Sequence, residues 1–183
     1  MVGEKTKYLP NYSITDYEQW EGKWELIEGI PYAMSPSPTF FHQEISSKIH
    51  IQLIEVLKNC KKCKALFALD WRLKDSENNV FCPDNFVTCK EIPGNFLTEA
   101  PDLIFEILSP STYEKDRLIK FEKYQENGVK YYIIVDADKK IAEVFELVSG
   151  KYSKLLNAKK DKINLELNDC KIDFDFEKIW SDF

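Results

Sequence analysis

The segment 101–120, PDLIFEILSPSTYEKDRLIK, constrains the fold more than any other part of the chain. Residues 103–108 form a short apolar run, which is typical of a strand buried on both faces. Glu106 lies in the middle of this run. A buried carboxylate needs a partner or a metal, because an uncompensated buried charge costs several kcal/mol or forces protonation. Glu106 is therefore a candidate functional residue; the alternative is a partly exposed acid paired with a lysine or an arginine.

A helix is predicted directly after this strand. Residues 109–112 form a helix-start cluster, and Ser111 with Glu114 has the spacing of a capping box. The pair Asn127-Gly128 predicts the end of the helix. Three polar residues recur at four-residue intervals and should share one helical face: Asp116, Lys120 and Tyr124. The strand acid is thus followed by a helix that presents a lysine.

The remaining pattern predicts a mixed α/β protein. Helical spacing over 39–58 and an apolar run over 131–135 add a long helix and a second strand beside the first. Pro83 interrupts a strand candidate and indicates an edge or an irregularity. Further strands are expected in 23–34, 65–73, 80–88, 141–147, 151–156 and 163–167, and short helices in 13–20 and 174–180.

Length and charge limit the classes of function. The 183 residues suit a single domain over 1–183, with 1–12 as a loosely held lead-in. The net charge of −6 argues against a basic protein that binds nucleic acid without regard to sequence. A nuclease remains compatible with this charge, because a carboxylate site takes its positive charge from a metal.

The five cysteines bear on the compartment and on metal binding. Their odd number, with no signal peptide and no long apolar segment, indicates a reduced, cytoplasmic protein with no membrane partner. Cys60 and Cys63 have zinc-ligand spacing, but the sequence offers no second such pair and has only two histidines. Free thiols are therefore expected, and a structural zinc is the alternative.

Two carboxylates and a lysine come together in the expected topology. Asp84 follows Pro83 in one strand, Glu106 lies in the next strand, and Lys120 lies in the following helix. Carboxylate oxygens suit Mg²⁺ or Mn²⁺, which can hold a phosphate and activate water. A nearby lysine can orient that water or offset charge in the transition state. These residues indicate phosphodiester hydrolysis.

The same residues carry a resemblance to a known family. Pro83-Asp84, followed after 22 positions by Glu106, resembles the PD-(D/E)XK signature of restriction-endonuclease-like proteins. Over roughly 15–145 the wider text resembles the Uma-type ("Uma two") family of such proteins. The matching text consists of WELIEGIPYAMSPSP, His42-Gln43, PDLIFEILSPST, Asp116, Lys120, Tyr124, Gly128-Val129 and Tyr132 to Asp136.

The resemblance implies a restriction-endonuclease-like α/β fold, a mixed sheet flanked by helices, in which Asp84 and Glu106 bind the metal. Glu25 matches the family's upstream acid. Two of these residues also have simpler interpretations. Asp84 could serve solely as a turn residue after Pro83, and Glu25 could face solvent on a hairpin. His42, near the start of the predicted long helix, is a candidate base or else a helix-start or core histidine.

The lysine departs from the general signature. A lysine is expected two residues after the acid, where this chain has Leu108. Lys120 in the following helix is the expected substitute, because the head group rather than the backbone position carries the function. Lys115 and Lys123 are its competitors, and a solvated helix lysine is the structural alternative.

The sequence therefore predicts a Mg²⁺- or Mn²⁺-dependent enzyme, an endonuclease whose substrate is DNA. A homodimer is an expected assembly, because nucleases that cut both strands often pair two sites. The main alternative is a module that binds nucleic acid or protein on the same fold without cleavage; the acidic net charge and Leu108 favour it. A thiol or zinc protein that uses Cys60 and Cys63 is the third.

Overall fold

The computed structural model of this chain describes residues 9–34 and 38–181. Residues 1–8 of the expected lead-in 1–12, and residues 35–37 after the first hairpin, lie outside the described part. None of the helices in the described ranges combines the length and the apolar character that crossing a membrane requires.

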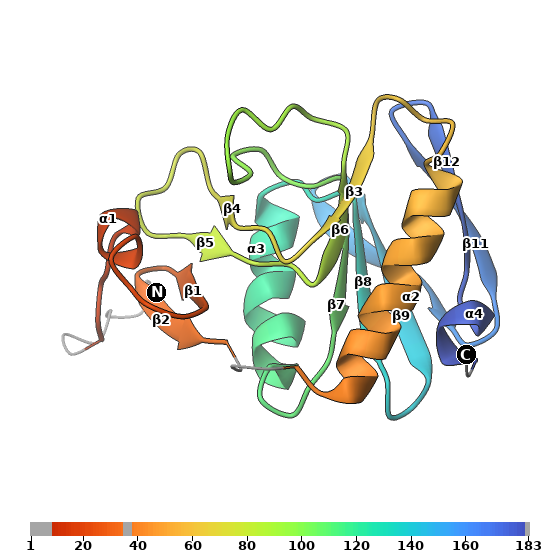
Figure 1. The fold of residues 1–183 in the computed structure, drawn as a ribbon, viewed down its shortest axis with the longest axis horizontal. Helices are drawn as coiled ribbons and strands as arrows, with labels where there is room; N and C mark the ends of the chain where they lie inside the picture. The colour runs from red at the N-terminus through yellow and green to blue at the C-terminus, as the bar shows by residue number, and fades with distance from the viewer. Residues whose placement is uncertain (1–8, 35–37, 182–183) are drawn as a thin grey trace.

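A mixed six-stranded sheet forms the centre of the described chain, with helices on both faces (Figure 1). Its strands, in spatial order, are β10 (Lys151–Ala158), β9 (Ile141–Val148), β8 (Tyr131–Asp136), β7 (Leu103–Ile107), β6 (Asn85–Thr88) and β3 (Lys64–Phe67). Strands β7 and β8 are parallel, and the other neighbours are antiparallel. The predicted mixed α/β fold is confirmed.

The two parallel strands form the most buried part of this sheet. Every residue of β7 and β8 is buried, so apolar side chains on both faces require cover from both sides. Glu106 lies opposite Ile134 in this pair. The strand, helix and strand expected between 103 and 135 are present in that order.

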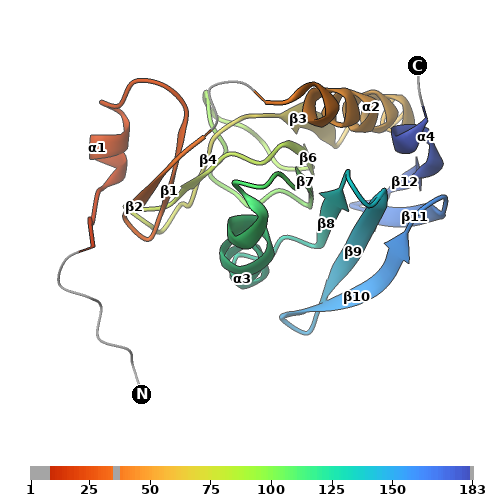
Figure 2. The same ribbon diagram turned by 90° about the horizontal axis from the view of Figure 1, so that it is seen from below.

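One face of the sheet is covered by a long helix and by the C-terminal elements, as Figure 2 shows. These are α2 (Phe40–Val56), β11 (Lys162–Leu167), β12 (Cys170–Asp175) and α4 (Glu177–Trp180). Ile49 and Leu53 of α2 join the apolar core of this face. The segment 163–167 is not an edge strand of the main sheet: it pairs with β12 in a separate two-stranded sheet, where Leu165 and Leu167 are buried in the same core.

The opposite face is covered by the helix that follows β7. It begins as a π-helix, η1 (Lys115–Lys120), and continues as α3 (Phe121–Glu126), with Gly128 just beyond its end at φ +80°. The expected capping box of Ser111 and Glu114 does not form. Instead, the Ser109 N–H donates to Thr112 Oγ1 at 3.2 Å, and Glu114 makes no side-chain cap.

A smaller sheet lies beside the main one on the N-terminal side (Figure 1). Its strands, in spatial order, are β2 (Ile30–Ala33), β1 (Trp24–Ile27), β5 (Val80–Phe81) and β4 (Trp71–Arg72), and α1 (Ile14–Tyr17) precedes them in the chain. The strand expected over 80–88 is therefore two strands, because Pro83-Asp84 separates β5 in one sheet from β6 in the other. The strand expected over 65–73 is divided in the same way into β3 and β4.

Four of the cysteines form disulfide bonds, although free thiols were expected. Disulfides join Cys60 to Cys170 and Cys63 to Cys89, so that expectation is wrong for four of the five. Cys82 is free and buried. The paired cysteines are 110 and 26 residues apart in the sequence. The fold brings them together, and their local spacing gives no sign of these pairs.

The turn between β1 and β2 generates a stability prediction. Gly29 has φ +77°, and a Cβ there would lie 2.4 Å from Asn11 Oδ1 and 2.9 Å from Asn11 Cα. We expect Gly29→Ala to lower the free energy of unfolding by more than the ~1–2 kcal/mol that a left-handed conformation costs alone. Gly150→Ala is the matched control, because Gly150 has φ +80° with open space around it. Chemical denaturation measures both variants, and equal losses would contradict the expected clash.

Candidate active site

Glu106 of β7 is buried between the sheet and the helix that follows it, with 2% of its surface exposed. Its Oε1 accepts hydrogen bonds from Lys120 Nζ at 2.9 Å and from Tyr124 Oη at 2.7 Å. Its Oε2 accepts a longer bond of 3.4 Å from the backbone N–H of Asp84. The alternative interpretation of Glu106 as a partly exposed acid is therefore wrong. The pairing with a lysine that this alternative included is present, since Lys120 contacts Glu106.

Lys120 connects three carboxylates. Its Nζ lies 2.8 Å from Glu25 Oε1, 2.9 Å from Glu106 Oε1 and 3.4 Å from Asp116 Oδ1, and 3% of its side chain is exposed. Such a lysine is not a solvated helix residue. The structure thus brings together Lys120, Glu106 and Glu25, three of the predicted site residues.

The two competing lysines lie in different places. Lys115 contacts Glu25 on the oxygen that Lys120 does not use. The π-helical turn explains this, because bonds from residue i to i+5 bring residues five apart onto one face. Lys123 forms ion pairs with Glu28 and Glu126 toward solvent. Among the three candidates, Lys120 is the one that meets Glu106.

Glu25 is fully buried in β1, so it does not face solvent on its hairpin. Its Oε1 accepts the backbone N–H of Cys82 at 2.9 Å, in addition to the contact from Lys120. Because Glu25 lies in the small sheet and Glu106 in the main sheet, Lys120 links the two sheets.

Asp84 directly precedes β6 and lies next to Glu106. Its Oδ2 accepts the backbone N–H of Ile107 at 2.8 Å and lies 3.1 Å from Nε2 of His42. His42 sits in the first turn of α2, whose N-cap is Thr39. The Asp84 and His42 side chains are each about one-fifth exposed, so this side of the group reaches solvent. His42 is therefore placed beside the carboxylates rather than in the apolar core.

Burial and mutual contact shift the titration of these groups. Burial raises the pKa of Glu106 well above its usual range; Lys120 opposes the rise, and Asp84 adds to it. Burial also acts to raise the pKa of Glu25, but the ammonium groups of Lys120 and Lys115 outweigh it, so this pKa is lowered. Burial acts to lower the pKa of Lys120, yet Glu106 and Glu25 raise it well above the usual value, which keeps Lys120 an ammonium ion.

The oxygen atoms of this group suit a divalent cation. It holds four carboxylates, of which Glu25, Glu106 and Asp116 contact Lys115 or Lys120, and Asp84 contacts His42. Glu106 Oε2 accepts the backbone N–H of Asp84, the Asp84 carboxylate accepts the N–H of Ile107, and both side chains offer the hard oxygen ligands that Mg²⁺ and Mn²⁺ prefer. The residues present therefore fit such an ion.

Tyr124 and Asp116 belong to the site, although the sequence predicts only that they share a helical face with Lys120. Tyr124 donates directly to Glu106, and Tyr132 of β8 donates to the backbone carbonyl of Asp116 at 2.9 Å. Their four-residue spacing from Lys120 was the signal. The contact between Lys115 and Glu25 had no such signal, because it depends on the π-helical turn.

Removing the central lysine tests the network. We expect Lys120→Met to lower the free energy of unfolding by about 3–5 kcal/mol, because buried Glu25 and Glu106 lose their shared cation. The double variant Lys120→Met with Glu106→Gln should recover part of that loss, because one of the two stranded charges is gone. Denaturant unfolding of both variants measures the coupling, and strictly additive losses would contradict it.

Comparisons with known proteins identify the family and the fold. Residues 14–170 match the family Uma2, described as "Putative restriction endonuclease". "Uncharacterized protein slr1290" of Synechocystis sp. is 31% identical over 144 residues, which cover 70% of each chain. A crystal structure titled as a putative nuclease belonging to DUF820, from Anabaena variabilis, matches with a TM-score of 0.75 over 92% of this chain and 97% of that chain; at 18% identity this likeness shows the fold. Since the family match spans most of the sequence, this protein belongs to the Uma2 family of restriction-endonuclease-like proteins.

Proposed function

We propose that this protein is a metal-dependent endonuclease that hydrolyses phosphodiester bonds in DNA. The observation that carries the proposal is the meeting of Asp84, Glu106 and Lys120 at the junction of two sheets. Membership of a family described as a restriction endonuclease supports the same reaction class. Expected assembly as a homodimer, with one site for each strand, forms part of this proposal.

Asp84 and Glu106 are the proposed ligands of Mg²⁺ or Mn²⁺. Both offer carboxylate oxygens, and the backbone N–H groups of Asp84 and Ile107 fix the relative position of the two side chains. When bound, such an ion supplies Lewis-acid stabilisation of the negative charge on the phosphate and lowers the pKa of water.

Lys120 is the proposed source of positive charge beside the metal ligands. Its ammonium group can orient the attacking water or offset charge that develops on the phosphate. Glu25 acts as a positioning residue, because it holds the same ammonium group from the opposite side at 2.8 Å. Tyr124 acts likewise by donating to Glu106.

His42 has two proposed roles at the exposed side of the site. Its Nε2 lies within hydrogen-bond distance of Asp84, so the ring can fix the orientation of that carboxylate. Asp84 acts to raise the pKa of His42 and outweighs the lowering effect of burial. A histidine in this position can also hold or release a proton near the substrate.

Cleavage assays test the proposal. The purified chain is incubated with supercoiled plasmid, linear duplex and single-stranded DNA, each with Mg²⁺, with Mn²⁺ and with a chelator. We expect cleavage that requires the metal, and a loss of about 100-fold or more in rate for Asp84→Asn and for Glu106→Gln, because each removes a charged ligand. Glu122→Gln on α3 is the matched control, since Glu122 is exposed, and it should cleave like the unmodified protein.

Several outcomes separate this proposal from its alternative. Cleavage that is unchanged in Asp84→Asn and Glu106→Gln would overturn the assigned site. Absence of cleavage on all three DNA substrates would overturn the proposed activity and favour a binding module. Calorimetric titration with Mn²⁺ adds an independent readout, because a module without catalysis has no need of a divalent ion at the carboxylates. Cleavage confined to RNA would keep the reaction and contradict the choice of DNA.

A further inference from the structure

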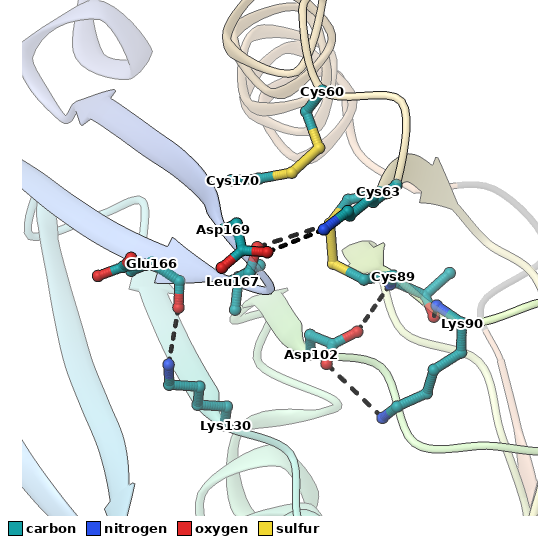
Figure 3. The surroundings of a disulfide bond; sticks show 12 residues. Cys60, Cys63, Cys89, Lys90, Asp102, Lys130, Glu166, Leu167, Asp169 and Cys170 are labelled. Atoms are coloured by element: carbon teal, nitrogen blue, oxygen red, sulfur yellow. Dashed lines mark hydrogen bonds and ion pairs between the residues drawn. A yellow bond between two sulfur atoms is a disulfide. The ribbon is translucent and has the colours of Figure 1, made fainter.

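We propose that the reduced chain binds one Zn²⁺ through Cys60, Cys63, Cys89 and Cys170, at a site separate from the carboxylate group. This inference does not depend on the proposed nuclease activity. Figure 3 shows the four cysteines converging from three parts of the fold below the end of α2. Cys60 and Cys63 lie between α2 and β3, Cys89 follows β6, and Cys170 begins β12.

The sulfur atoms are close enough to share one ion. Those of Cys60, Cys63 and Cys170 all lie within 4.8 Å of one another, and Cys89, outside this group of three, joins it through its bond to Cys63. Tetrahedral zinc with four thiolates, at Zn–S distances of about 2.3 Å, places neighbouring sulfurs roughly 3.8 Å apart. Three of the sulfurs therefore already lie near the spacing of zinc ligands, and the Cys89 sulfur must separate from that of Cys63 to take the fourth position.

The local sequence suits a structural zinc site. Two cysteines separated by two residues, as in Cys60-Lys-Lys-Cys63, are a common half of a four-cysteine site. The second half comes from Cys89 and Cys170, which are far apart in the sequence. Cys63 and Cys170 are buried, and Cys60 and Cys89 are partly buried, as expected of a closed site with four protein ligands.

The charges around the cluster favour thiolates. A zinc ion with four thiolates carries a net charge of about −2, which nearby cations would offset. A pocket beside the cluster has Cys89 in its wall and is lined by four lysines: Lys61, Lys62, Lys64 and Lys90. Two of them are partly neutralised, because Lys62 pairs with Asp169 and Lys90 with Asp102. Thiolates are the form that binds metal, and nearby lysines lower the cost of forming them.

The disulfide and zinc forms are related by a balanced reaction. A thiol reductant that opens both disulfides supplies four electrons and four protons, and four thiols result. Zn²⁺ then displaces those four protons as it binds the thiolates. An oxidant of the disulfide class reverses the reaction and releases the metal.

In either form, the cluster adds covalent or metal links between parts of the fold that also pack in one apolar core. It connects the end of α2, the main sheet at β6 and the hairpin of β11 and β12. Loss of the metal from the reduced chain should therefore loosen the C-terminal hairpin first, since Cys170 begins β12.

Metal analysis of the whole chain tests the inference. The protein is purified with a thiol reductant and without chelator, its zinc is measured by elemental analysis, and Co²⁺ is exchanged for the metal under anaerobic conditions. We expect about one Zn²⁺ per chain and a Co²⁺ absorption spectrum with intense sulfur-to-metal charge-transfer bands and tetrahedral d–d bands. Zinc well below one equivalent after reduction and reconstitution, or a spectrum without sulfur ligation, would overturn the site.

Variants and thiol protection identify the ligands. Cys63→Ser and Cys89→Ser should lose the bound zinc, whereas Cys82→Ser should retain it, because burial raises the pKa of Cys82 to about 12 and keeps it a thiol away from the cluster. Glu106→Gln should also retain zinc, which separates this site from the carboxylates. If the cysteine variants fail to fold, alkylation of the unmodified chain followed by mass spectrometry decides: zinc should protect the four cluster cysteines, and alkylation unaffected by zinc would contradict the proposal.

Discussion

The ammonium group of Lys120 is the contact on which the rest of this structure depends. It is buried between Glu25 of the small sheet and Glu106 of the main sheet, and it comes from the helix that follows β7. A buried charge of this kind is tolerated only when its partners are held in place, because desolvation costs several kcal/mol per ion. Strands β1 and β7 and the helix that carries Lys120 therefore fix one another. As a result, Glu25 and Glu106 are held in a preorganised arrangement before any ligand binds.

Local backbone irregularities produce this arrangement. Pro83-Asp84 lies in the short connection between β5 of the small sheet and β6 of the main sheet. This position places Asp84 beside Glu106. The π-helical turn over Lys115–Lys120 delivers two lysines to the two oxygens of Glu25. Both features depart from regular strands and helices, and such departures are frequent at functional sites.

The sequence predicted those helices, strands and site residues that depend on the pattern of neighbouring residues in the chain. The buried strand around Glu106, its helix ending at Gly128 and the parallel strand β8 followed from apolar runs and from helix-end chemistry. Lys120 followed from its four-residue spacing to Asp116 and from the resemblance to a family. The division of 65–73 and 80–88 between two sheets did not, because an apolar run does not say which neighbour a strand will pair with. The cysteine pairs were missed for the same reason, since contacts across 110 residues leave no trace in local spacing.

Helix α2 relates the two groups of reactive side chains described above. Its 17 residues extend roughly 25 Å at 1.5 Å per residue. His42, in its first turn, contacts Asp84, and the cysteine cluster lies just beyond its last turn. The cysteine cluster and the carboxylate group therefore lie at opposite ends of one helix, far enough apart for each to bind its own ligand.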